Sequence, residues 1–379
     1  MSGRSISGAF FLASLLLRSG NLAAAEPQPG QPASCTLYVE NDSFLSTDRY
    51  YTNGIRLTRS FGADGLPQWA HRTRWIEHVL EHVSHCPPGV SDDSCFNFET
   101  AWTFGQNLYT PDDIRTSHLI PDQRPYGAWL YYGNVLTLSK SDRQHSLEID
   151  AGAAGGSLAL GGAVQSRWHA LLRAANNSDT PPDPKGWGNQ INNQPGLQLL
   201  YQHRRRFFER TRSHLRYFDL GSQVNAALGT VGDSASAGAT VRLGYNLPNE
   251  FTELIPSLIP PLAPPEPSGS PEAALASYRR HPPLARQAPF PSTRRWEAYL
   301  FARADQRYVA YSAFLDGNIR LFGRSHSVPK EPWVTDLQAG AVLGYSHWRL
   351  SVTYVDRSPE FRAQRGHQDF LSFTVLHRR

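Results

Sequence analysis

The sequence predicts an all-β protein, a twelve-stranded antiparallel transmembrane β-barrel of the outer membrane. Segments of about ten residues, in which apolar side chains alternate with small or charged ones, recur along the whole chain. Leu350, Val352 and Tyr354, for example, alternate with Ser351 and Thr353. A soluble β-sandwich would show similar alternation. No apolar run after the N-terminus is long enough for a membrane helix, but an outer-membrane barrel needs none, because only alternate residues of its strands face lipid.

Twelve segments carry this alternation. They lie at residues 35–42, 51–60, 98–109, 128–139, 144–154, 195–205, 214–227, 236–246, 295–315, 334–346, 347–357 and 368–378. An even number places both chain termini on the periplasmic side of the membrane. The connections at 61–97 and 247–294 then lie in the periplasm, and a short helix is expected in the extracellular connection at 155–194.

The two periplasmic connections are unusually long for a barrel. The first has apolar residues at helical spacing, which predicts an amphipathic helix that caps the barrel mouth or binds the membrane surface. The second has eleven prolines from Pro256 to Pro291. Such a composition cannot form a core and predicts an extended segment.

The N-terminal residues 1–25 have the features of a secretory signal peptide. Arg4 precedes the apolar run 9–17, and Ala23–Ala25 supplies the small residues of a cleavage site. Residues 26–379 are therefore predicted to form a single barrel domain after the signal peptide is removed.

Charge and cysteine content exclude some functions. The formal net charge is +4 at neutral pH and loses two positive charges with Arg4 and Arg18, so the composition does not indicate nucleic acid binding. Cys86 and Cys95 lie nine residues apart. A small disulfide between them is plausible in an oxidising compartment. Cys35 would then have no cysteine partner. Three cysteines at this spacing do not provide the four ligands of a structural zinc site.

Residues 37–60 contain two short alternating segments joined by a loop rich in oxygen donors. The strand ends bring together Asn41, Asp42 and Thr52, which is more polar than a hairpin turn requires. Such hard oxygen donors suit a Ca²⁺ ion or a polarised ester carbonyl, although Asn-Asp-Ser runs are also common in ordinary turns. Strict alternation puts Asn41 and Asp42 on opposite faces, so we expect the strand to end or bulge near residue 41.

The 155–194 connection contains a helical pattern between about residues 158 and 175. Gln165 and His169 are four residues apart and therefore share one face of this helix, beside an apolar stripe that includes Trp168. A single histidine beside a tryptophan is most often a packing or surface residue. If the helix lies at the rim of the bilayer, His169 points towards the ends of the first strands.

Short motifs occur in a fixed order from the first predicted strand to the last. They are Glu40–Phe44, Thr47–Arg49, Tyr51–Gly54, Gly105–Pro111, Arg124–Tyr131, Gln165 with His169, Gly186 and Trp187 with Gln190, Leu315–Asn318, Ser325–Val328, and Glu360 with Phe361. No single motif is specific. As an ordered set, they resemble the lipid A 3′-O-deacylases (LpxR type) of the Gram-negative outer membrane, over nearly all of the mature chain.

The resemblance implies a twelve-stranded barrel and a Ca²⁺-dependent carboxylic ester hydrolase. Its substrate would be lipid A, the lipid part of lipopolysaccharide, from which it removes the 3′-linked acyloxyacyl group in the outer leaflet. The family's Asn-Asp pair falls on Asn41 and Asp42, which are also the expected metal ligands. Its hydroxyl residue falls on Thr52 and its catalytic histidine on His169.

The sequence departs from the family pattern at three points. Arg115 is the nearest basic residue where the family can carry a lysine, and Ala175 stands where an acidic residue can follow the histidine. We assign substrate binding to Arg115 and Gln165. The chain ends in Arg379 rather than in the aromatic residue usual for barrel assembly, although the barrel assembly machinery is still the expected partner during insertion.

The expected chemistry is coherent for an ester. Histidine changes its protonation near neutral pH and can take a proton from water, and a bound Ca²⁺ ion would polarise the ester carbonyl. No G-x-S-x-G motif indicates a serine nucleophile. Two alternatives stay open: an outer-membrane phospholipase-type esterase that acts on glycerophospholipids, and a barrel that acts passively as a channel or a structural protein.

Overall fold

The computed structural model describes residues 34–45, 49–61, 97–140, 142–176, 181–213, 215–248 and 296–378. The predicted signal peptide at 1–25, the pair Cys86 and Cys95, and almost all of the long connections at 61–97 and 247–294 lie outside these residues. Within them, no helix combines the length and the apolar character needed to cross a membrane.

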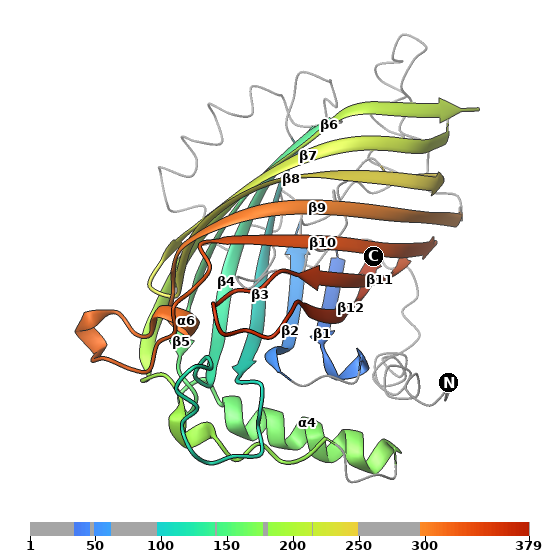
Figure 1. Ribbon diagram of the computed structural model, residues 1–379. Helices are drawn as coiled ribbons and strands as arrows, with labels where there is room; N and C mark the ends of the chain where they lie inside the picture. Colours follow the sequence, from blue (N-terminus) through green and yellow to red (C-terminus); the bar gives the residue numbers. More distant parts are fainter. Residues whose placement is uncertain are drawn as a thin grey trace.

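The described strands form one closed antiparallel β-barrel (Figure 1). They are β1 (Ser34–Asn41), β2 (Tyr50–Phe61), β3 (Asn97–Thr110), β4 (Gly127–Ser139), β5 (Arg143–Ala154), β6 (Gln194–Arg212), β7 (Leu215–Gly229), β8 (Gly232–Tyr245), β9 (Trp296–Ser312), β10 (Trp333–Tyr345), β11 (Trp348–Arg357) and β12 (Gln368–Arg378). Each strand pairs with its neighbours in sequence, and β1 pairs with β12, so no sheet edge stays open. The predicted twelve-stranded barrel is confirmed.

Short helices lie in the connections at the end of the barrel opposite to the chain termini. They are α4 (Gly161–Asn176), α6 (Ala313–Asp316), and the 3₁₀ turns η1 (Ser43–Leu45), η3 (Trp187–Asn189) and η4 (Arg320–Phe322). We call this end the loop end and the other the terminal end; in an outer-membrane barrel the terminal end faces the periplasm. The strand predicted at 295–315 is divided between β9 and α6, because the chain folds into the barrel mouth after Ser312.

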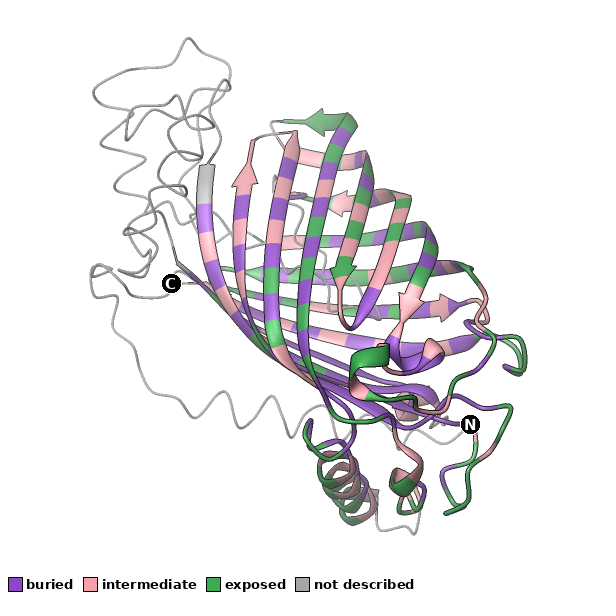
Figure 2. Cartoon of the chain, turned by 90° about the vertical axis from the view of Figure 1, so that its left-hand side faces the viewer, coloured by how far each residue is buried: buried purple, intermediate pink, exposed green. Residues whose placement is uncertain are grey.

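Side chains alternate between the outer face of the barrel and its lumen (Figure 2). On β9, Leu300 is 62% exposed whereas the next residue, Phe301, is 5% exposed. The exposed apolar positions suit membrane hydrocarbon, and the lumen holds polar and charged side chains in addition to aromatic ones.

A layer of packed aromatic side chains crosses the lumen near the loop end. Its members are Tyr51, Tyr109, Trp129, Tyr131, Phe314 and Phe370. The rings of Tyr109 and Phe314 stack with their centroids 4.1 Å apart, and α6 supplies Phe314. Each of the six side chains is at most 3% exposed, so this aromatic layer is packed rather than open to water. The layer argues against the passive channel.

Buried ion pairs connect strands inside the lumen. Arg357 on β11 donates hydrogen bonds of 2.6 and 3.2 Å to the carboxylate of Asp336 on β10. Arg56 on β2 reaches past β3 and β4 to Glu148 on β5, at 3.0 Å. Because such charges are far from bulk water, each depends on its partner, and removing one member of a pair leaves the other uncompensated.

Asp336→Asn is expected to lower the free energy of unfolding by about 3–5 kcal/mol, because it leaves the buried Arg357 guanidinium without its carboxylate. The matched control is Asp142→Asn, which removes the partner of Arg143 in an exposed pair and should change stability little. Urea unfolding in detergent micelles measures both. Equal losses in the two variants would contradict a structural role for the buried pair.

Candidate active site

The first strand ends at the predicted position. β1 stops at Asn41, Asp42 begins the turn, and η1 follows. Within β1, Glu40 faces the lumen, where it accepts hydrogen bonds from the hydroxyl groups of Tyr38 and Tyr51. By the alternation of a strand, Asn41 therefore faces outwards, towards the lipid side of the wall. The expected break near residue 41 is confirmed.

A bulge in β2 completes this corner. The pairing of β2 with β3 shifts register between Tyr51 and Asn53, which makes Thr52 the extra residue. The Thr52 hydroxyl is 2.7 Å from the hydroxyl of Thr110 on β3. The backbone carbonyl of Thr52 lies 3.5 Å from the backbone nitrogen of Asp42. The structure thus brings Asn41, Asp42 and Thr52 together at the loop end of β1 and β2.

Local hydrogen bonds hold the corner. The Oδ1 atom of Asn41 accepts hydrogen bonds from the backbone N–H, at 2.7 Å, and from the hydroxyl of Ser43. The Oδ2 atom of Asp42 accepts a hydrogen bond of 2.7 Å from the backbone N–H of Arg49. Asn41, Asp42 and Thr52 are all buried. The amide nitrogen of Asn41 has no hydrogen-bond partner among the described residues, so its two N–H donors are available to a ligand.

The helix α4 carries Gln165 and His169 on its buried face. Both are 1% exposed, whereas Leu171 on the opposite face is 64% exposed. Gln165 Oε1 accepts a hydrogen bond of 2.8 Å from the indole N–H of Trp187, which follows in η3. His169 Nδ1 lies 2.7 Å from the carbonyl oxygen of Pro182. A carbonyl only accepts hydrogen bonds, so Nδ1 of this ring carries a proton.

The segment that leads into α4 packs against the outer wall of the barrel. Ala159 contacts Leu108 on β3 and Ala128 on β4, and its carbonyl accepts a hydrogen bond from the side-chain amide of Gln106 on β3. Figure 1 shows α4 beyond the loop ends of these strands. The segment therefore covers the wall on its lipid side.

This cover explains the burial of outward-facing residues at the loop end. Asn41, Thr52 and Gln106 are at most 4% exposed, whereas Phe104, which faces outwards farther along β3, is 49% exposed. A polar cluster thus lies outside the barrel but away from solvent. Gln165 and His169 are buried on the covering helix, against the chain that follows it. Arrangements of this kind are expensive in a membrane and are usually functional.

Arg115 lies apart, with an exposed side chain, in the connection between β3 and β4. The same connection contacts the segment after α4, because the backbone N–H of Lys185 bonds to the carbonyl of Ile114 at 2.9 Å. Asn189 also donates a hydrogen bond to the carbonyl of Ser117. The sequence did not predict that Gln106 and Pro182 help to position the helix. Gln106 was noted only as part of a motif, and Pro182 was not noted at all.

The corner offers oxygen donors for a metal ion. Among the described residues, no three or more His, Cys, Asp or Glu side chains group together as a metal site. Asp42 supplies one buried carboxylate, and Asn41 and Thr52 add amide and hydroxyl oxygens. Hard neutral and anionic oxygens of this kind fit Ca²⁺ rather than a transition metal.

Comparison with known proteins decides the family. The profile of the family described as outer membrane protein LpxR matches residues 10–379. The chain belongs to the LpxR family of outer membrane proteins. Its barrel places it in the outer membrane with the rest of that family.

A solved structure shares the barrel fold. LpxR from Salmonella typhimurium superimposes with a TM-score of 0.64 at 18% sequence identity, covering 91% of this chain and 100% of that one. The β domain of the Bordetella autotransporter BrkA gives a TM-score of 0.38 at 8% identity, covering 93% of this chain and 99% of that one. The first likeness confirms the fold, and the second does not bear on function. No curated protein sequence matched the chain.

Substitution of two adjacent glycines, Gly161 and Gly162, tests the packing of α4 against Trp187. A Cβ atom at Gly161 would lie 2.2 Å from the Trp187 ring, whereas one at Gly162 would lie 3.1 Å from it. Gly161→Ala should destabilise the packing of α4 by about 1–3 kcal/mol and speed hydrogen exchange across the helix. Gly162→Ala should leave exchange unchanged or slow it, because alanine favours helix. Equal exchange in the two variants would contradict the contact with Trp187.

Proposed function

We propose that this LpxR-family protein is a lipid A 3′-O-deacylase. It hydrolyses the ester that links the acyloxyacyl group to the 3′ position of lipid A in the outer leaflet. Membership of the family implies lipid A deacylation in general. The observation that carries the proposal is the buried polar cluster on the lipid side of the wall, covered by the segment that continues into α4, whose buried face carries Gln165 and His169. A membrane lipid reaches that side of the barrel without leaving the bilayer.

His169 acts as the general base. Its Nδ1–H is held by the Pro182 carbonyl, and Nε2 is the atom that takes a proton from a water molecule in this proposal. That water attacks the ester carbonyl carbon, the bond from this carbon to the 3′ oxygen breaks, and the proton on Nε2 passes to the 3′ oxygen. The products are a free 3′ hydroxyl and a carboxylic acid.

Residues at the end of β1 stabilise the charge that develops on the carbonyl oxygen. The N–H donors of Asn41 suit this role because they have no partner among the described residues. Asp42 and Asn41 would hold a Ca²⁺ ion, which would supply further positive charge beside the carbonyl. Thr52 positions the corner, Gln165 orients the lipid, and Arg115 binds its anionic head group.

Replacing the base tests the reaction. His169→Ala should reduce release of the 3′-linked acyl group by about 10²-fold or more, measured by mass spectrometry of lipid A from cells that carry each variant. His203→Ala is the control, since His203 lies on the outer face of β6, away from the site. Unchanged release from His169→Ala would rule out this mechanism. Release of fatty acid from glycerophospholipids instead of lipid A would support the phospholipase alternative.

Removing the metal ion tests the assigned ligands. EDTA should stop the reaction and Ca²⁺ should restore it, because the carbonyl loses its polarising charge. Asp42→Asn should need at least about tenfold more Ca²⁺ for half-maximal activity, since ligand charge sets affinity. Asp122→Asn, at an exposed carboxylate in the β3–β4 connection, should behave as the wild type. Full activity in EDTA would exclude the metal.

A further inference from the structure

A single glutamine at the start of β12 bonds to the corner at the ends of β1 and β2 from inside the barrel. Gln368 is buried and faces the lumen. In the sheet, β1 lies between β12 and β2, but the last residue of β1 that pairs with β12 is Asn41, opposite Leu371. The first residues of β12 therefore extend past the end of β1, and Gln368 reaches β2 directly.

The side-chain nitrogen of Gln368 donates two hydrogen bonds to the backbone of β2. Its partners are the carbonyl oxygens of Arg49, at 3.0 Å, and of Tyr51, at 2.8 Å. Because carbonyl oxygens only accept, these partners determine that the nitrogen of the amide faces β2. The amide oxygen of Gln368 has no hydrogen-bond partner among the described residues. A buried acceptor without a partner costs stability, so the benefit of an amide at this position lies in its two donors.

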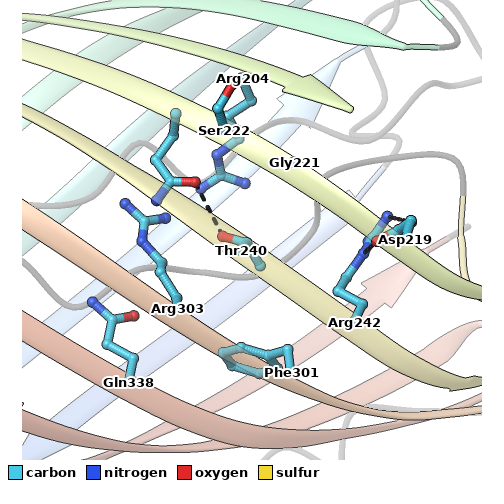
Figure 3. A pocket seen from close by; sticks show the side chains of 10 residues that line it. Arg204, Asp219, Gly221, Ser222, Thr240, Arg242, Phe301, Arg303 and Gln338 are labelled. Carbon is cyan, nitrogen blue, oxygen red and sulfur yellow. Dashed lines mark hydrogen bonds and ion pairs between the residues drawn. The ribbon is translucent and has the colours of Figure 1, made fainter. Parts of the chain in front are cut away.

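On the wall of the lumen formed by β6 to β8, buried polar side chains bond instead to direct partners on the adjacent strand. Arg242 of β8 binds Asp219 of β7 through hydrogen bonds of 2.8 and 2.6 Å (Figure 3). Gln202 of β6 donates one of 2.7 Å to Asn225 of β7. Such bonds stabilise the pairing of two strands, whereas Gln368 holds main-chain atoms of a strand with which it does not pair.

The two carbonyls that Gln368 binds lie on either side of Tyr50, whose backbone is in the left-handed region. Its φ angle is 67°, a conformation that a bulky residue rarely adopts and that persists only where the surrounding structure holds it. The connection between β11 and β12 holds the side chain. The backbone N–H of Arg365 donates a hydrogen bond of 3.1 Å to the Tyr50 hydroxyl, and the Tyr50 ring packs against the edge of Phe361. Gln368 holds the backbone before and after Tyr50.

The same backbone positions the residues of the corner. The N–H of Arg49 donates a hydrogen bond of 2.7 Å to Oδ2 of Asp42. The carbonyl of Tyr51 belongs to the peptide unit that begins Thr52, the extra residue of the bulge. A movement of Arg49 would therefore move the Asp42 carboxylate, and a rotation of the peptide unit after Tyr51 would move the Thr52 hydroxyl.

We propose that Gln368 is a positioning residue for the reaction at the corner. It does not touch the lipid; from the lumen it fixes the backbone that holds the Asp42 carboxylate and the Thr52 hydroxyl on the other side of the wall. Its part in the reaction rests on the proposed deacylase function, whereas its hold on the backbone does not.

Gln368→Met tests the role, because methionine is unbranched and similar in length but donates no hydrogen bond. The backbone amide of Arg49 should exchange its hydrogen about tenfold faster, since the loop opens more easily without the two bonds. NMR of the protein in detergent micelles without lipid measures this exchange. The kcat for release of the 3′-linked acyl group should fall by about tenfold or more. The KM for lipid A should change little, because Gln165 and Arg115 are not altered.

Gln202→Met is the matched control. Gln202 is also a buried glutamine of the lumen whose nitrogen is bonded and whose oxygen has no partner among the described residues. Its substitution should leave the exchange of Arg49 and the kcat unchanged. If Gln368→Met does not fold, Gln368→Asn replaces it: the amide is kept but is one methylene too short to reach both carbonyls, so the same changes should be smaller.

Three outcomes would overturn the proposal. They are unchanged exchange at Arg49 in a folded Gln368 variant, faster exchange with an unchanged kcat, and equal effects in Gln202→Met. A wild-type protein that releases no acyl group from lipid A would instead refute the proposed function, and the exchange measurement would still decide whether Gln368 holds the corner.

Discussion

The site depends on one constraint: polar groups on the lipid side of a membrane barrel must be covered. In a strand every second residue faces outwards, and hydrocarbon offers no hydrogen bonds to those residues. Asn41, Thr52 and Gln106 occupy such positions and are nevertheless buried. The segment 155–176, which leads into and forms α4, supplies the cover, and the bond from Gln106 to the carbonyl of Ala159 ties it to the wall. The covering segment is therefore part of the structure of the proposed site as well as the carrier of His169, the proposed base.

The same constraint explains the irregular backbone at the corner. A regular β1 would direct Asn41 to the lipid and Asp42 to the lumen, so the two side chains could not serve one ligand. Ending β1 at Asn41 removes Asp42 from the alternation, and the bulge at Thr52 lets β2 follow without losing its register with β3 farther along. Both irregularities occur where the chemistry is proposed, and the pairings of β1 with β2 and of β2 with β3 are regular on the terminal side of them.

Much of the fold could be predicted from the sequence, because a strand's alternation is local and survives in the residue pattern. The twelve segments and the end of β1 near residue 41 were accessible in this way. The alternation of residues did not show which face of each strand points into the lumen. The aromatic layer formed by Tyr109, Trp129 and their neighbours was therefore not predicted. Nor could the alternation show that Pro182 binds the ring of His169, since that contact depends on how the chain returns after α4. Contacts between distant strands depend on how the sheet closes into a barrel, and local alternation of residues does not predict them.

Packing inside the lumen bears directly on the residues outside it. Glu40 and Tyr51 bond to each other on the lumen side, and each is followed in sequence by a corner residue, Asn41 and Thr52. A shift of Glu40 and Tyr51 would therefore also move Asn41 and Thr52, because the backbone connects each residue to the next. Tyr51 is fixed in turn by ring contacts with Tyr109 and Phe370 in the aromatic layer. A dense interior thus gives the wall the rigidity that a preorganised site requires, and the proposed site on the outside of the barrel would depend on this filled interior.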